Sequence, residues 1–324
     1  MNEREIKYDW IKGLLIVLMV FGHTERMGSA QGLINSIIRI IYLFHMPCFI
    51  IISGYFFSVK GHWERVGKAW SRLLKPYLII GILYQAGLSL AKNCGIPTSG
   101  LASDTFWEAF MKLVNGRGGG ALWFVYALFV NQMMMIGISY LKNRVGNFIC
   151  AYICLVLLAI SPYLPKAFSV LSPSWFLLYF CIGMMIKEFS ATVRGISWSL
   201  ILTCALGLIV LRVDSDVPYY VYKLSFLNIG LVCSALITLL WIAEKLTHYP
   251  IIGKWGVFLG QHTMPILCFH AIFSVLVKPI LSKVLIFDSS GIVYAVCNVV
   301  VVIILSLLLE FVLKKIKLYR LIFM

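Results

Sequence analysis

YDWIKGLLIVLMVFGH, residues Tyr8–His23, is an apolar run that begins among charged residues and ends at a histidine. On an α-helix, Lys12 and His23 lie about 16 Å apart along the axis and about 20° apart around it, and Asp9 lies about 40° from His23. The three side chains therefore share one face of the predicted helix. An ionisable group in such a segment is costly unless it meets a partner or a wet cavity, so this face is a candidate functional site. The alternative is a histidine that hydrogen-bonds a neighbouring helix and has no other role.

The composition is that of a membrane protein. Hydrophobic residues make up 61% of the 324 residues and charged residues 13%, which is too apolar for a soluble globular domain. Lys and Arg number 28 against 13 Asp and Glu. These basic residues lie mostly between apolar runs, so membrane topology explains them better than nucleic-acid binding. The nine cysteines contain no C-x-x-C pair and argue against a disulfide framework or a zinc site, and we expect no metal.

About ten stretches are long enough to cross a hydrocarbon core of about 30 Å. An even number of crossings puts both termini on one side, and the excess of basic residues in the connections on that side predicts that both termini are cytoplasmic. The sequence therefore predicts an all-α, polytopic membrane protein with one transmembrane domain over residues 1–324. We place the spans near residues 10–27, 33–58, 76–92, 122–141, 148–165, 172–187, 196–212, 222–243, 258–286 and 292–313, with a bend in the ninth at Pro265 or Pro279.

Three histidines are predicted to lie at a similar depth. If the cytoplasmic ends of the first, second and ninth spans are level, His23, His45 and His270 each lie roughly 16 to 20 Å from the inner surface. A shared internal site is the more economical interpretation, and three separate packing histidines are the alternative. Glu25 can orient the His23 imidazole only if the first helix has ended before it, because on a continuous helix it points about 200° away.

Other residues in or beside the spans are given packing or peripheral roles. Pro47 frees a backbone carbonyl in the second span, and Ser53 and Gly54 allow neighbouring backbones to approach closely. Glu310 lies near the basic C-terminal tail and is expected to be a solvated residue at the membrane interface. The longest connection, residues 93–121, is glycine-rich near its end and is expected to face outside, either as a lid or as a plain flexible loop.

A cluster of basic residues lies between the second and third spans. Residues 60–75 contain five Lys or Arg against one acidic residue, Glu64. Cytoplasmic anchoring of the spans explains such a cluster. The alternative is a docking site for an anionic cytosolic ligand such as the phosphates of coenzyme A, for which arginine geometry is well suited. Arg72 and Lys75 are the best candidate contacts, because they adjoin the helix that begins at Pro76, and Lys68 lies one turn earlier.

Together these motifs resemble the integral-membrane acyltransferase 3 family over nearly the whole chain. Within that family the chain is similar to the compact fucose 4-O-acetylase-like and polysaccharide O-acetyltransferase members. The matching segments are Lys12 followed by ten residues and His23, Phe44–Pro47 with Ser53–Phe57, Arg72–Tyr77, Leu122–Phe124, Trp175–Gly183 and Gly260–His270.

The resemblance implies an enzyme of the bacterial inner membrane. Members of this family usually move an acetyl group from acetyl-CoA to a hydroxyl of a surface polysaccharide or a lipid-linked sugar. Lys12 and His23 correspond to the family's basic-x10-His motif, which is implicated in catalysis. Arg72-x-x-Lys75 corresponds to its R-x-x-R motif, with lysine replacing the second arginine.

The sequence thus supports a working mechanism in which a neutral His23 is the general base on the acceptor hydroxyl and His45 orients it or donates to the oxyanion. A transient acyl-histidine is an alternative route. A transporter or flippase that uses the histidines as a proton relay is the rival function, and a structural scaffold is a third.

Membrane lipids are expected partners, and homo-oligomerisation is left open. The candidate residues are His23, His45 and Glu25 for catalysis, Lys12, Lys68, Arg72, Lys75 and Trp123 for acetyl-CoA, and Asp9, Ser53 and His270 in supporting roles.

Overall fold

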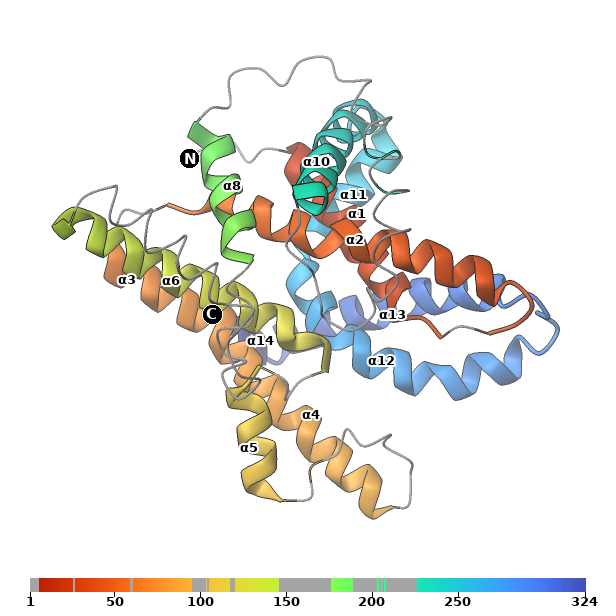
Figure 1. The fold of residues 1–324 in the computed structure, drawn as a ribbon. Coiled ribbons are helices and arrows are strands. Elements are labelled where there is room, and N and C mark those ends of the chain that lie inside the picture. Colours follow the sequence, from red (N-terminus) through yellow and green to blue (C-terminus); the bar gives the residue numbers. More distant parts are fainter. Residues whose placement is uncertain are drawn as a thin grey trace. The chain divides into compact units, whose positions relative to one another are not determined.

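The structure, a computed structural model, is all-helical in the part of the chain that it describes (Figure 1). That part comprises residues 6–25, 27–58, 61–94, 103, 105–116, 120–145, 176–188, 203, 205, 207 and 226–324. The predicted α class is confirmed for these residues. The predicted fifth span, 148–165, and nearly all of the seventh, 196–212, lie outside them. The number of spans and the cytoplasmic termini therefore stay predictions.

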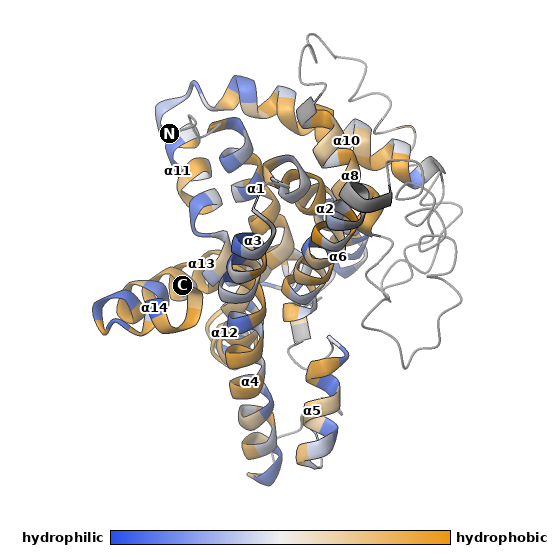
Figure 2. Cartoon of the chain, turned by 90° about the vertical axis from the view of Figure 1, so that its left-hand side faces the viewer, coloured by the Kyte–Doolittle hydropathy of each residue, from blue (hydrophilic) through white to orange (hydrophobic). Residues whose placement is uncertain are grey.

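Six helices in the described residues are long and apolar enough to cross a membrane. Hydrophobic residues predominate on the last of them, which contains the apolar run VVVVIIL (Figure 2). The chain is therefore a multi-pass membrane protein. The six candidate spans are Gln31–Phe56, Trp63–Asn93, Trp123–Tyr140, Asn228–Leu246, Thr263–Val284 and Ile292–Lys315.

The chain divides into two compact units, which we describe separately. Unit 1 comprises Met1–Ile52 and Ile186–Glu310, and unit 2 comprises Ser53–Met185 and Phe311–Met324. Unit 1 contains α1 (Ile6–Gly22), most of α2 (Gln31–Phe56), α10 (Phe226–Leu246), α11 (Pro250–Gln261), α12 (Thr263–Val284) and most of α13 (Ile292–Lys315). Unit 2 contains α3 (His62–Ala69), a π-helical turn (Trp70–Leu74), α4 (Lys75–Asn93), α5 (Phe106–Val114), a 3-10 turn (Gly120–Leu122), α6 (Trp123–Val145), most of α8 (Phe176–Glu188) and α14 (Leu318–Phe323).

In unit 1, α1 packs against α11 and α10 (Figure 1). Its side chains Ile11, Leu15 and Ile16 are fully buried. Glycines allow α1 and α11 to touch through their backbones. A Cβ on Gly260 would overlap the carbonyl oxygen of Asp9, and one on Gly13 would overlap that of Gly256. The helix ends at Gly22, five residues before the predicted limit, so His23 lies beyond its last turn.

The predicted ninth span is two helices. α11 ends at Gln261 and α12 begins at Thr263. The break lies one turn before Pro265. A proline lacks the N–H that would bond the carbonyl four residues earlier, and its ring clashes with that carbonyl. The expected effect of Pro265 is therefore seen one turn upstream. At Pro279, the other position named for the bend, α12 continues as one helix.

In unit 2, Trp63–Asn93 forms one long helical segment through α3, the π-helical turn and α4. Helix α5 lies beside α4 in both views (Figures 1 and 2). The predicted connection 93–121 thus contains a helix that the sequence pattern had not indicated, and most of its glycine run, residues 117–119, lies outside the described residues. The close approach predicted at Gly54 is confirmed, because a Cβ there would overlap the carbonyl oxygen of Phe180.

We expect Gly260→Ala to destabilise the α1–α11 contact. The added methyl group has no room beside the Asp9 carbonyl, and such overpacking costs about 1–3 kcal/mol. The apparent melting temperature in detergent should fall. Gly32→Ala is the matched control, because nothing lies within 4 Å of a Cβ at this helical position. Equal melting temperatures for the two variants would contradict the proposed backbone contact.

The turn before α13 is held by Asp288. Its Oδ1 accepts the Ser290 hydroxyl at 2.6 Å and the Gly291 N–H at 3.1 Å, and its Oδ2 accepts the Tyr294 N–H at 2.8 Å in the first turn of α13. An acceptor at this position satisfies N–H groups that the helix leaves unbonded. These bonds, the one from Ser290 above all, hold the pKa of the Asp288 carboxyl below its ordinary value of 3.8.

Asp288→Ala should therefore lower the melting temperature by a few degrees at pH 7. A carboxyl whose folded-state pKa is lowered stabilises the fold above its unfolded-state pKa, and that stabilisation is lost as the pH falls through the folded-state value. The difference between wild type and Asp288→Ala should shrink as the pH drops below 3.8. Thermal denaturation at several pH values measures this, with exposed Ser289→Ala as the control; a difference that is constant with pH would contradict the carboxylate cap.

Candidate functional site

Unit 1 brings the three predicted histidines together with one tyrosine. The ring of His23 lies 5.0 Å from that of His270, between centroids, at an interplanar angle of 51°. The ring of Tyr42 lies 6.4 Å from His23 and 5.1 Å from His45. We call these four residues the histidine cluster. They come from the end of α1, the middle of α2 and the middle of α12.

The histidines differ in their access to solvent. His23 is exposed, whereas His45 and His270 are 1% and 0% exposed. His23 lies just past the end of α1, whereas the other two lie within α2 and α12. Of the three histidines, His23 is the residue with exposed surface, so we expect a substrate to meet it first, while the other two can act on it or hold it.

Backbone carbonyls fix the tautomers of the two buried rings. His45 Nδ1 lies 2.8 Å from the Ile41 carbonyl oxygen, and His270 Nδ1 lies 2.9 Å from that of Leu267. A carbonyl oxygen only accepts, so each Nδ1 carries the hydrogen and each neutral ring keeps its lone pair on Nε2. The Nε2 of His270 is buried and has no hydrogen-bond partner. It is an acceptor without a donor, on a ring that adjoins His23.

Hydrogen bonds from other helices hold the end of α1. The Tyr42 hydroxyl donates to the Gly22 carbonyl at 3.2 Å. On the other side of His23, Asn298 of α13 donates through Nδ2 to Thr24 Oγ1 at 3.2 Å, and both side chains are buried. Sequence reasoning missed these residues. The signal for Asn298 was available, since it interrupts the apolar run AVCNVVVV.

The charged start of α1 forms an ion pair. Lys12 Nζ lies 2.7 Å from Asp9 Oδ1, and the two side chains are 22% and 2% exposed. The sequence placed both residues on one face with His23. The structure shows that the pair occupies the start of the helix, where the lysine offsets the charge of a nearly buried carboxylate.

Glu25 lies beyond the end of α1, so the condition for it to turn toward His23 is met. Its carboxylate instead forms an ion pair with Lys278 of α12, and both side chains are exposed. The described contacts of Glu25 are therefore those of a residue that links two segments of unit 1, and they contain no bond to His23.

Glu310 is not a solvated interfacial residue, and that prediction is wrong. It is 3% exposed, and its Oε2 lies 2.7 Å from Nδ1 of His262, the residue at the break between α11 and α12. A carboxylate buried this deeply needs such a partner. No local sequence pattern indicates this pairing, because 48 residues separate the two.

The remaining candidates belong to unit 2. Arg72 is exposed on the π-helical turn Trp70–Leu74, and Lys75 follows as the first residue of α4. Turns of this type are rare and frequently occur at functional sites. Lys68 is in an exposed ion pair with Glu64. Trp123, the first residue of α6, and Ser53, in α2, are half-buried.

Comparison with known proteins agrees with the resemblance seen in the motifs. A family model for an acyltransferase domain, acyltransferase 3, matches residues 5–311. The chain is 26% identical over 211 residues to the nodulation protein NolL of Mesorhizobium japonicum. The matched region is 61% of this chain and 52% of that protein. The chain is 25% identical over 202 residues to NolL of Sinorhizobium fredii, covering 58% and 50%. The chain thus spans about half the length of the curated relatives it matches, and no solved structure matches it. The match over residues 5–311 shows that this chain belongs to the acyltransferase 3 family of membrane proteins.

Proposed function

We propose that the protein is a membrane O-acyltransferase that moves an acetyl group from acetyl-CoA to a hydroxyl of a surface polysaccharide or a lipid-linked sugar. The observation that carries this proposal is an exposed His23 beside a buried His270 whose Nε2 lacks a donor. Family membership supports acyl transfer as the reaction class. The donor, the acceptor and a location in the bacterial inner membrane with cytoplasmic termini are parts of the proposal.

His23 is the general base in this mechanism. In the proposed mechanism the two rings rotate so that one ring nitrogen of His23 donates to Nε2 of His270, and their centroid separation of 5.0 Å permits such a bond. The other nitrogen of His23 then holds a lone pair for the proton of the acceptor hydroxyl. This is the arrangement of a base oriented by a third group, with a histidine in the place that a carboxylate often takes.

The reaction balances with these groups. The hydroxyl oxygen attacks the thioester carbonyl while its proton passes to His23. The tetrahedral intermediate collapses and breaks the carbon–sulfur bond. The proton on His23 then passes to the departing sulfur, so that the products are the acetyl ester and free coenzyme A, and His23 is neutral again.

His45 is suited to one of its two expected roles. Its Nδ1–H is already given to the Ile41 carbonyl, so a neutral ring has no second N–H for an oxyanion. It can still accept a hydrogen bond through Nε2. Because Tyr42 contacts both His45 and His23, we assign His45 to positioning Tyr42 and, through it, the end of α1.

The basic residues of unit 2 are proposed to bind the coenzyme A phosphates. Arg72 presents an exposed guanidinium, and its planar fork can bind a phosphate through two hydrogen bonds. Lys75 and Lys68 add positive charge on the same helical segment. Trp123 is proposed to contact the cofactor, and Lys12 to add positive charge for it.

His23→Ala should abolish acetyl transfer while leaving the fold intact. Loss of a general base lowers kcat by about 10²–10⁴-fold. Purified protein in nanodiscs, supplied with acetyl-CoA and acceptor, is assayed with a thiol reagent for free coenzyme A. His248→Ala is the matched control, since His248 is an exposed histidine outside the cluster. Full activity of His23→Ala would refute the mechanism, and a wild-type protein that releases no coenzyme A would favour the transporter instead.

The positioning role of His270 has its own test. His270→Ala should lower kcat by about 10–100-fold with little change in KM for acetyl-CoA, because it removes only the acceptor that orients His23. His270→Gln, which keeps an acceptor oxygen, should recover part of the loss. A rise in KM with unchanged kcat, or no difference between the two variants at equal melting temperature, would contradict this role.

A further inference from the structure

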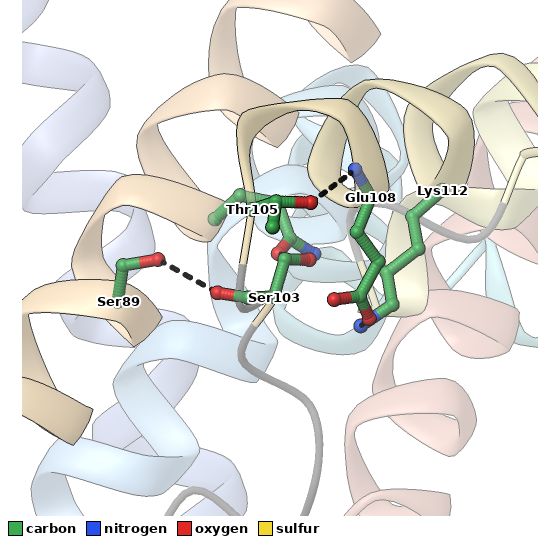
Figure 3. Close-up of polar contacts among 6 residues, drawn as sticks. Ser89, Ser103, Thr105, Glu108 and Lys112 are labelled. Carbon is green, nitrogen blue, oxygen red and sulfur yellow. Dashed lines mark hydrogen bonds and ion pairs between the residues drawn. The ribbon is translucent and has the colours of Figure 1, made fainter.

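Helix α5 is amphipathic and carries an aromatic face. Thr105 caps its start by accepting the Glu108 N–H at 3.1 Å (Figure 3). Only Leu113 is buried along the helix. The rings of Phe106 and Trp107 each stack on Phe110, at centroid separations of 6.5 and 5.5 Å.

The side chains of this face are apolar, yet they are exposed. Phe106 is 85% exposed, Trp107 65%, Phe110 43% and Met111 40%. The only charged residues of α5, Glu108 and Lys112, form an ion pair with each other at 2.8 Å, so the helix has no net charge. In water, four adjoining large apolar side chains would be a costly surface.

Helix α5 runs back along its neighbour α4. Near its start, the Ser103 hydroxyl donates to Gln85 Oε1 at 3.0 Å. The Ser89 hydroxyl donates to the Ser103 carbonyl at 3.5 Å (Figure 3). Near its end, Leu113 packs at Gly81. These partners on α4 belong to the candidate span Trp63–Asn93, so α5 packs alongside that span.

Tyrosine hydroxyls from α4 and α6 bond the last two carbonyls of α5. The Tyr77 hydroxyl donates to the Leu113 carbonyl at 2.7 Å, and the Tyr126 hydroxyl donates to the Val114 carbonyl at 2.9 Å. The last carbonyls of a helix have no partner within the helix. In water they can bond the solvent, but in a bilayer they must be bonded by protein. Two tyrosine hydroxyls on these two carbonyls therefore fit a helix end inside the membrane.

We propose that α5 is a re-entrant membrane helix whose face of Phe106, Trp107, Phe110 and Met111 contacts lipid. The segment enters the membrane beside α4 instead of forming a loop outside it. Lipid is the occupant that fits, because the face is aromatic and aliphatic, the helix is neutral, and its neighbour has the length and composition of a span. Tryptophan and phenylalanine on one face are typical of helices inserted at the membrane boundary. This inference does not depend on the proposed reaction.

Spin labels on this face give the test. Trp107→Cys and Phe110→Cys are made in a background with the native cysteines replaced, labelled, and reconstituted in phosphatidylcholine nanodiscs. Power saturation then compares access of oxygen, which concentrates in lipid, with access of a water-soluble nickel chelate. Val300→Cys is the lipid reference, since Val300 is 50% exposed on the apolar α13. Ser289→Cys, exposed in the turn before α13, is the aqueous reference.

Spin labels at Trp107 and Phe110 should show the same access to oxygen and to the nickel chelate as the label at the Val300 reference. Values equal to those of Ser289 would overturn the proposal in favour of a loop in water, and exclusion of both reagents would overturn it in favour of a protein partner or a second copy. If the cysteine-free background fails to fold, Trp107→Phe in the native chain serves instead. Brominated phospholipid should then quench a smaller fraction of the tryptophan emission than in wild type, and an unchanged fraction would contradict lipid contact.

Discussion

The structure depends on one constraint, which is that polar groups inside an apolar helical bundle must be bonded by the protein itself. The simplest response is a side chain that bonds its own helix. Asn131 donates to the Ala127 carbonyl and Ser306 to that of Val302, each at 2.8 Å. His45 and His270 do the same through Nδ1. In these two histidines the structural bond also decides which nitrogen stays basic, so the fold prepares the chemistry of the site.

The second response is a bond between helices, and it positions the reactive end of α1. Tyr42 and the Asn298–Thr24 pair attach the residues on either side of His23 to α2 and α13. The helix is anchored at its other end by glycine contacts with α11. An imidazole just past a helix end would otherwise have wide freedom. These contacts restrict that freedom while leaving the ring exposed, which is what a base that meets a substrate requires.

The sequence predicted the parts of the fold that follow from local pattern. Apolar runs located α2, α6, α10 and α13 to within a few residues, and helical spacing placed Asp9 beside Lys12. The predictions failed where the deciding contact is distant in sequence. Glu310 is paired with His262, and the segment before Gly116 folds into α5 because α4 supplies partners for it. The contact of Tyr42 with His23 was not predicted either. It joins two helices, and a tyrosine in a membrane span is too common to indicate a site.

A cryo-EM structure of the protein with a non-hydrolysable acetyl-CoA analogue would test most directly whether the histidine cluster is where the thioester reacts. We expect the carbonyl of the analogue to lie within hydrogen-bonding or near-attack distance of the His23 ring, with room for a sugar hydroxyl between them and with the His23–His270 contact retained. A carbonyl bound elsewhere, with the His23 ring packed against lipid and no passage from it to the cytosol, would contradict the proposed site.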